Sequence, residues 1–217
     1  MRILKEGIPF ILLPLAAAMI LLVISTSEIC AEFHSPLRMS LIVLSAIFVI
    51  FSLFCCFFFR SPATKINLSE NYILSPCNGT VMEIDKTDNN ETVIRTFLSI
   101  FNVHLQRSPA DGIVKNVEFK KGKFYAAWNS KAESENQQNI ISIETKSGTM
   151  IVRQISGFVA RRCVSRVKPG DNIKQGQMIG LIKFGSQVDL HLGKNIKINI
   201  APGDKVIAGV TVMGQIK

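Results

Sequence analysis

The sequence has 217 residues, of which 47% are hydrophobic, and its formal net charge at pH 7 is +9. These values exclude an intrinsically disordered chain, a collagen-like repeat and a small protein held together mainly by disulfides. Residues 1–60 contain four basic and three acidic residues, whereas residues 61–217 contain 21 basic and 13 acidic residues. The sequence therefore predicts an apolar N-terminal part followed by a basic domain.

Two apolar segments without a charged residue, 8–24 and 39–59, lie in the N-terminal part. A helix needs about 20 apolar residues to cross the hydrocarbon core of a bilayer, and the second segment has that length. The first segment is shorter and contains Pro9 and Pro14. A partial span, a signal peptide and a buried core helix therefore stay open for it. We predict a membrane hairpin over residues 1–60, formed by two transmembrane helices.

Basic residues flank this hairpin unequally. Arg2, Lys5, Arg60 and Lys65 lie at its outer ends, whereas the connecting loop has only Arg38. Cytoplasmic flanks carry the excess of Lys and Arg, so we predict that both ends lie on the cytoplasmic side of the inner membrane. The domain that follows would lie there too.

The rest of the chain has the pattern of a mainly β domain. Residues 61–74 are polar and predict a linker, and residues 75–217 form the predicted domain. Within it, 92–100 predicts a strand and 139–155 a hairpin, whereas 130–138 predicts a short helix.

An internal repeat with an offset of 33 residues divides this domain. Ser75–Val81 matches Ser108–Val114, and Val167–Gly176 matches Ile200–Gly209. The Pro, Gly and Asp residues of these segments favour tight turns. Such turns resemble the hammerhead units of lipoyl and biotinyl carrier domains, so we predict a duplicated, hammerhead-like β domain.

Conventional catalytic motifs are absent from the sequence. His104 and His191 are the only histidines of the domain, and neither a C-x-x-C pair nor a phosphate-binding loop occurs. We therefore expect no metal site. The Gly185-Ser186 peptide, which follows an apolar strand, offers different chemistry, because glycine leaves its carbonyl accessible to the adjacent hydroxyl. By itself, this dipeptide predicts only a turn.

The combination resembles the short form of phosphatidylserine decarboxylase, a proenzyme that makes its own pyruvoyl group. The most specific similar segments are Phe184-Gly185-Ser186 and the pattern Asn102-Val-His104-x-x-Arg107-x-Pro109. Further similar segments lie in the same order along residues 75–217: Ser75–Val81, Lys121–Phe124, Val159–Arg162 and Val167–Asp189.

The resemblance implies that Ser186 attacks the Gly185 carbonyl and that the chain splits there. The β chain (1–185) and the α chain (186–217) would stay paired as a heterodimer, and a higher oligomer is left open. Ser186 would become an N-terminal pyruvoyl group, with neither pyridoxal phosphate nor a metal. A Schiff base between this group and phosphatidylserine would allow loss of CO2 and yield phosphatidylethanolamine.

His104 is the expected base for cleavage and the expected proton donor for decarboxylation. His191 is expected on the strand face opposite Ser186. Where the family has an aspartate, this chain has Asn78. The residue that orients His104 is therefore Asn78 itself, which we rank first, Asp111 of the related turn, or a deamidated Asn78.

The positive charge of the domain indicates which kind of partner it binds. A basic domain beside a membrane is expected to attract anionic phosphatidylserine, and Arg161 and Arg162 are candidate phosphate contacts. No nucleic-acid-binding module is recognisable. Two alternatives remain: a membrane-tethered, lipoyl- or biotinyl-like adaptor, and an unprocessed, inactive relative.

Overall fold

The computed structural model divides into two compact units, Met1–Ala63 and Thr64–Lys217. The described residues are 1–27, 35–87, 91–125, 132–157, 162–183 and 186–216.

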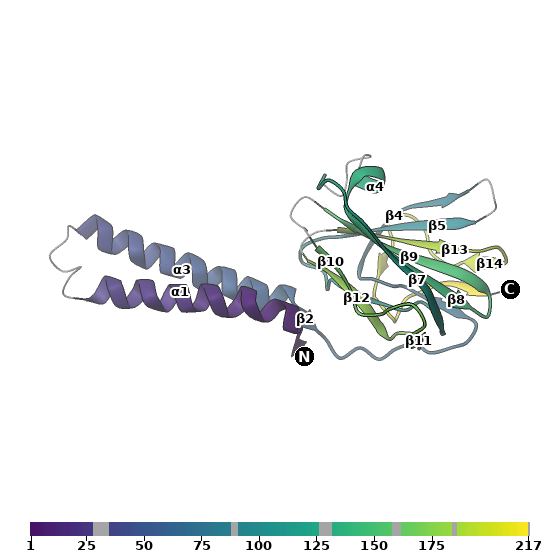
Figure 1. Cartoon of the computed structure of the whole chain (residues 1–217), viewed down its shortest axis with the longest axis horizontal. Helices are drawn as coiled ribbons and strands as arrows, with labels where there is room; N and C mark the ends of the chain where they lie inside the picture. Colours follow the sequence, from purple (N-terminus) through teal and green to yellow (C-terminus); the bar gives the residue numbers. More distant parts are fainter. Residues whose placement is uncertain (28–34, 88–90, 126–131, 158–161, 184–185, 217) are drawn as a thin grey trace. The chain divides into compact units, whose positions relative to one another are not determined.

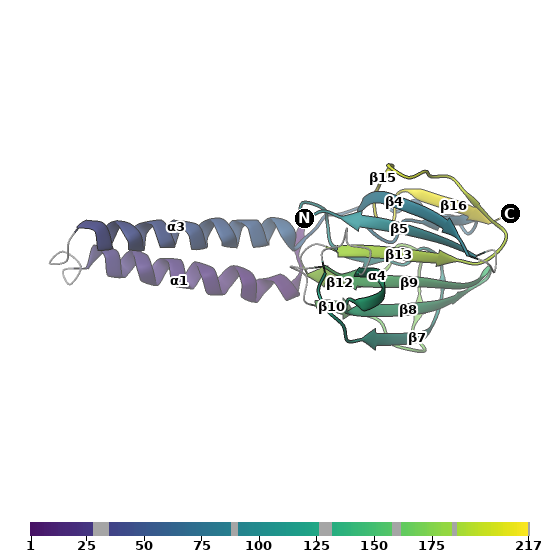
Figure 2. The same ribbon diagram turned by 90° about the horizontal axis from the view of Figure 1, so that it is seen from above.

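The N-terminal unit is a pair of helices, α1 (Ile8–Thr26) and α3 (Ser35–Phe58), which lie side by side (Figures 1 and 2). Both are long and apolar enough to cross a membrane. Helix α1 continues through Pro14, and α3 begins four residues earlier than the apolar segment 39–59. The short elements at the base of the pair are β1 (Arg2–Ile3), η1 (Lys5–Gly7) and β2 (Arg60–Ser61).

Serine side chains join the two helices. Ser45 Oγ donates to the carbonyl of Ala18 at 2.9 Å, and Ser52 Oγ donates to the carbonyl of Ile11 at 2.8 Å. Small hydroxyl residues at a helix interface allow close packing and satisfy their own polar groups, as in membrane helix pairs.

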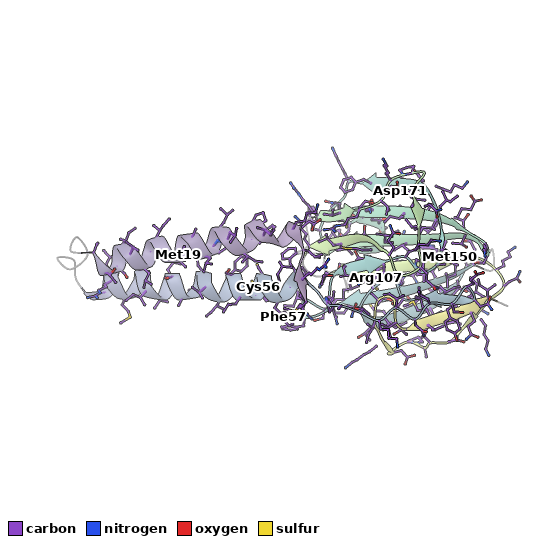
Figure 3. The ribbon with its side chains drawn as sticks, turned by 90° about the horizontal axis from the view of Figure 1, so that it is seen from below. Met19, Cys56, Phe57, Arg107, Met150 and Asp171 are labelled. Carbon is purple, nitrogen blue, oxygen red and sulfur yellow. The ribbon has the colours of Figure 1, made fainter. Side chains whose placement is uncertain are left out.

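Apolar side chains cover the outside of the pair. Met19 is 57% exposed and Phe57 is 43% exposed, and Figure 3 shows both along the helices. A surface of this kind is unfavourable in water and matches hydrocarbon. The helix pair therefore points to membrane association.

The C-terminal unit is built from antiparallel strands, as Figure 2 shows. Within the described residues, an eight-stranded sheet has the order β11-β7-β8-β9-β13-β5-β4-β15. Two three-stranded sheets have the orders β10-β12-β6 and β14-β16-β3. The strands are β3 (Tyr72–Leu74), β4 (Gly79–Lys86), β5 (Thr92–Leu98), β6 (Leu105–Arg107), β7 (Gly112–Lys120), β8 (Gln138–Thr145), β9 (Gly148–Ser156), β10 (Arg162–Ser165), β11 (Asn172–Ile173), β12 (Met178–Lys183), β13 (Ser186–Leu192), β14 (Ile196–Ile198), β15 (Lys205–Val206) and β16 (Val212–Ile216).

The structure confirms the mainly β fold with two apolar helices before it. The predicted strand 92–100 is β5, and the predicted hairpin 139–155 is β8 and β9. Within the predicted helix 130–138, residues 130 and 131 lie outside the described part, Ala132–Glu135 form α4, and Gln138 already begins β8. Strand β3 lies at the end of the segment 61–74 that was predicted as a linker.

The core of this unit joins residues from all three sheets. Val188 of β13, Ile182 of β12 and Met213 of β16 belong to one buried cluster. Met150 of β9 is also in it, and Figure 3 labels its side chain within the domain. Burial of this apolar surface supplies the main driving force for folding.

The predicted repeat is present as a structural duplication. The N–H of Gly176 donates to the carbonyl of Ser108, and the N–H of Gly209 donates to the carbonyl of Ser75, both at 2.9 Å. Strand β11 pairs with β7 in the same register as β15 pairs with β4, 33 residues away. Both glycines have positive φ angles, of 76° and 75°, which only glycine adopts readily.

Candidate active site

Ser186 is the first residue of β13, in the middle of the large sheet. Its backbone pairs with Leu98 of β5 on one side and with Ser156 of β9 on the other. The register is continuous along β13, so Ser186 shares the core face with Val188 and Leu190. His191 lies on the opposite face.

The hydroxyl of Ser186 is fully buried. Among the residues that the structure describes, Ser186 Oγ has no hydrogen-bond partner. A buried hydroxyl without a partner costs about 1–3 kcal/mol, so such groups are rare and often serve chemistry. Gly185, whose carbonyl Ser186 is expected to attack, lies outside the described residues.

His104 lies at the same end of the strands as Ser186. It is 2% exposed and immediately precedes β6. Its carbonyl accepts the N–H of Ile182 at 3.1 Å, and Ile182 is the penultimate residue of β12. Ile182 lies four residues before Ser186 in the sequence, so His104 lies near the start of β13.

The side chain of His104 has a defined tautomer. Its Nδ1 lies 2.9 Å from the carbonyl oxygen of Asn102. A carbonyl oxygen only accepts hydrogen bonds, so Nδ1 carries the proton and Nε2 holds the lone pair of the neutral ring. His104 is thus arranged to take a proton through Nε2.

A tight turn fixes the carbonyl that orients this ring. The N–H of Asn102 donates to the carbonyl of Ser99 at 2.8 Å, and Asn102 Oδ1 accepts the N–H of Ser99 at 2.9 Å. Ser99 directly follows Leu98, the strand partner of Ser186. Asn102 has no role predicted from the sequence, although it stands in the specific pattern around His104.

Asn78 and Asp111 occupy equivalent places in the two repeats. Asn78 Oδ1 accepts the N–H of Ala208 at 3.2 Å, and Asp111 Oδ1 accepts the N–H of Gln175 at 2.7 Å. Each side chain thus holds the turn of its own repeat.

The two positions lie at different ends of the large sheet. Gly79, next to Asn78, precedes the Thr80–Phe97 pair, which places Asn78 near the level of Leu98 and Ser186. Asp111 precedes β7, whose first residues pair with the end of β8 and lie level with the start of β9. The structure therefore brings Asn78 toward the Ser186 end, whereas Asp111 is exposed at the opposite end.

Of the two arginines predicted to contact a substrate phosphate, the structure describes only one. Arg161 lies outside the described residues. Arg162 is the first residue of β10, is exposed, and pairs in register with Lys183. Since Ile182 bonds to His104, Arg162 and Lys183 lie at the same end of the domain as the serine and histidine.

A chain of buried amides supports the backbone of His104. Gln106 Nε2 donates to the His104 carbonyl at 2.9 Å, and Gln106 Oε1 accepts from Gln154 Nε2 at 2.6 Å. Gln154 Oε1 in turn accepts from Asn139 Nδ2 at 2.6 Å. The three amide side chains are at most 3% exposed. The sequence hints at this network only through polar residues at strand positions that face the core, where such residues need hydrogen-bond partners.

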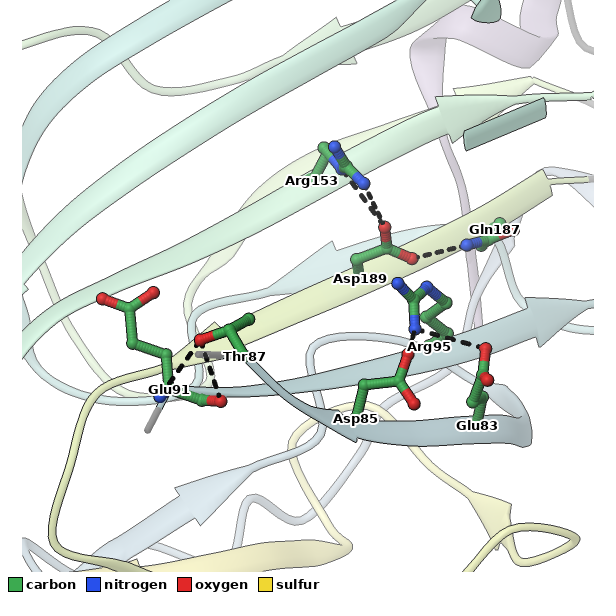
Figure 4. A network of polar contacts seen from close by, with 8 residues as sticks. All are labelled: Glu83, Asp85, Thr87, Glu91, Arg95, Arg153, Gln187 and Asp189. Carbon is green, nitrogen blue, oxygen red and sulfur yellow. Dashed lines mark hydrogen bonds and ion pairs between the residues drawn. The ribbon is translucent and has the colours of Figure 1, made fainter. Parts of the chain in front are cut away.

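A second polar group lies on the other face of β13. Asp189 is fully buried, accepts two hydrogen bonds from Arg153 at 2.9 and 3.1 Å, and accepts a third from Gln187 at 2.7 Å (Figure 4). Arg95 of β5 binds the more exposed Glu83 and Asp85 of β4. The buried ion pair fastens β13 to β9, just after Ser186.

Cys77 is a poor candidate for nucleophilic chemistry. Burial raises the pKa of its thiol to about 12, hydrogen bonds from Thr96 and Ser75 oppose the rise, and Asp189 adds to it. The thiol is therefore neutral near pH 7, and a neutral thiol is a weak nucleophile. Within the described part of the chain, no three His, Cys, Asp or Glu side chains gather as a metal site.

Comparison with known proteins gives consistent matches. The family model described as phosphatidylserine decarboxylase matches residues 51–214. A phosphatidylserine decarboxylase proenzyme of Carboxydothermus hydrogenoformans is 41% identical over 178 residues, covering 79% of this chain and 83% of that protein. The proenzyme of Desulfotalea psychrophila is 36% identical over 219 residues, covering 98% and 95%. A Wolbachia proenzyme is 36% identical over 176 residues, covering 76% of each chain.

Proposed function

Because the chain belongs to the phosphatidylserine decarboxylase family, we propose that it is processed between Gly185 and Ser186 and that Ser186 and His104 carry its chemistry. The activity of the family is the conversion of phosphatidylserine to phosphatidylethanolamine and CO2. One observation carries the proposal. Ser186 is the first residue of β13, and its buried hydroxyl has no hydrogen-bond partner among the described residues.

Cleavage begins with proton transfer from Ser186 Oγ to His104 Nε2. Oγ then bonds to the Gly185 carbonyl carbon, the peptide C–N bond breaks, and the proton passes to the nitrogen of residue 186. The product of this acyl shift is an ester. Neutral imidazole suits both proton transfers, because it accepts and returns a proton near physiological pH.

Elimination then separates the two chains. A base removes the Cα proton of residue 186, the Cβ–Oγ bond breaks, and the chain ending at Gly185 leaves as a carboxylate. Water hydrolyses the resulting dehydroalanine, releases ammonia and leaves a pyruvoyl group at the new N-terminus.

The residues present fit such a group. A pyruvoyl group at position 186 would supply an electrophilic carbonyl for the substrate amine and an electron sink for the loss of CO2. The neighbouring Leu98 and Ser156 backbones would hold it in place through the β13 ladder. His104 Nε2 would deliver the proton that replaces CO2.

The α chain, residues 186–217, would remain bound after cleavage. Strand β13 pairs on both sides with strands of the β chain, and Asp189 binds Arg153. The processed protein would therefore be a heterodimer of its own two chains.

Arg162 and Lys183 at the Ser186 end of the domain, together with the helix hairpin, suit a lipid substrate. Arg162 lies at the Ser186 end, where it is available to the phosphate of phosphatidylserine, and Arg161 precedes it in the sequence. Basic residues at the outer ends of the hairpin favour a cytoplasmic domain at the inner membrane. Asn78 would act by holding the turn at Ala208 near this site, whereas Asp111 does the same for the other repeat.

Intact mass under denaturing conditions tests the proposal. We expect two chains, split after Gly185, with the smaller one blocked by a pyruvoyl group. Ser186→Ala should give one chain and no decarboxylation, and His104→Ala should slow cleavage strongly. Cys163→Ala serves as a matched control, since its side chain lies on the neighbouring β10 outside the proposed chemistry. A wild-type protein that stays one full-length chain with phosphatidylserine membranes would refute self-processing and favour an inactive relative or an adaptor.

A further inference from the structure

An apolar turn projects beside the proposed active site. In the turn Ser99–Asn102, Ile100 is 38% exposed and Phe101 is 66% exposed. Two large apolar residues at the tip of a tight polar turn are unusual, because turn tips normally face water and carry polar side chains.

Hydrogen bonds and strand pairing connect this turn to the proposed catalytic residues. Two hydrogen bonds between Ser99 and Asn102 close it, and its last carbonyl binds Nδ1 of His104. Its first residue follows Leu98, which pairs with Ser186. A surface that receives Ile100 and Phe101 would therefore be held at a fixed place relative to both proposed catalytic residues.

Positive charge accompanies the apolar tip. Arg162 and Lys183 pair across β10 and β12, and Lys183 follows the residue that bonds to His104. Apolar side chains that enter the acyl boundary, with basic side chains at the level of the headgroups, are the features of interfacial membrane binding.

We propose that Ile100 and Phe101 enter the surface of an anionic phospholipid bilayer and bring the Ser186–His104 site to the headgroup of phosphatidylserine. This surface is defined by Ile100, Phe101, Arg162 and Lys183, which all belong to the C-terminal unit. The inference rests on the proposed site, because its purpose is to present substrate there.

Fluorescence quenching tests the contact without relying on activity. The chain has one tryptophan, so Phe101→Trp in a Trp128→Phe background gives a single reporter. The full-length protein is reconstituted into vesicles of phosphatidylcholine and phosphatidylserine with brominated acyl chains. Ile113→Trp is the matched control, because Ile113 is 46% exposed and pairs with Glu144 at the opposite end of the sheet.

We expect about threefold stronger quenching at position 101 than at position 113, because interfacial side chains lie about 5–10 Å into the boundary of the acyl chains. Ile100→Trp should behave like Phe101→Trp, which keeps the test valid if one variant folds poorly. Equal or negligible quenching at positions 100 and 101 overturns the proposal, and protection of these tryptophans that rises with protein concentration would assign the turn to a second copy.

The ratio of two decarboxylation rates distinguishes an effect on membrane contact from an effect on the catalytic site. In Phe101→Ser, the rate with vesicle phosphatidylserine, divided by the rate with monomeric short-chain phosphatidylserine, should fall about tenfold, the effect of withdrawing part of one phenyl ring from an apolar phase. An unchanged ratio overturns the membrane contact while leaving the chemistry at Ser186 intact. Loss of cleavage in the wild-type protein would instead contradict the proposed function.

Discussion

Replacing Asp189 by alanine should destabilise the domain far more than replacing a carboxylate on its surface. The Asp189 side chain is fully buried and accepts hydrogen bonds from Arg153 and from Gln187 (Figure 4). Arg153 is 19% exposed. Asp189→Ala would remove the carboxylate that binds this mostly buried guanidinium.

The expected loss follows from this geometry. Removing one partner of a buried ion pair costs about 3–5 kcal/mol, because the other charge stays buried and uncompensated. For a domain of this size, about 1 kcal/mol corresponds to about 2–4 °C in Tm, so the Tm should fall by about 6–20 °C. Asp85→Ala is the matched control. Asp85 is 42% exposed, and its pairing with Arg95 should be worth about 0–1 kcal/mol.

The measurement is denaturant unfolding of the full-length protein in mild detergent, with Ser186→Ala in every variant. That background keeps the chain in one piece, so unfolding remains a reaction of one molecule. The reasoning fails if Asp189→Ala and Asp85→Ala lower the free energy of unfolding equally. In the processed protein, Asp189→Ala should also release the α chain at lower denaturant concentration, since β13 loses its side-chain link to β9.

Three further predictions concern the site and its surroundings. Asn102→Ala removes the acceptor of the Ser99 N–H and should slow cleavage about two- to tenfold, the effect of one hydrogen bond; Asn102→Asp keeps the acceptor, and an equally slow Asp variant would contradict an orienting role. Asn78→Ala should lower the free energy of unfolding by about 1 kcal/mol by removing the bond to Ala208; peptide mapping of the processed wild type should show an unmodified Asn78 amide, and finding aspartate there would make deamidation the trigger. Burial raises the pKa of the Cys77 thiol from 9.0 to about 12, so this thiol loses its proton at lower pH in the unfolded chain than in the folded one. The free energy of unfolding should therefore fall as the pH rises above 9, by about 1 kcal/mol at pH 10. Denaturant unfolding at several pH values measures this loss, which should be absent in Cys77→Ala.

The site was only partly accessible to sequence reasoning. The pattern around His104 and the Gly185-Ser186 peptide marked two segments about 80 residues apart, and the structure brings His104 and Ser186 to one end of the strands. By analogy with a carboxylate, the sequence ranks Asn78 first as the residue that orients His104, before Asp111 and a deamidated Asn78, and this stays a prediction. The structure adds the carbonyl oxygen of Asn102, which lies 2.9 Å from Nδ1 of His104. A backbone carbonyl has no residue-specific signature, so its role depended on the conformation of the turn.

The sequence by itself determined the features that depend on local composition. Helix length and apolarity predicted the hairpin, alternation predicted β5, β8 and β9, and the 33-residue repeat predicted paired turns, because each property is set by neighbouring residues. Only the tertiary structure decided which polar groups are buried together. The Arg153–Asp189 pair, the amides of Gln106 and Gln154, and the Ser186 hydroxyl, which has no partner among the described residues, depend on strand order and register. Distant segments fix these jointly through core packing.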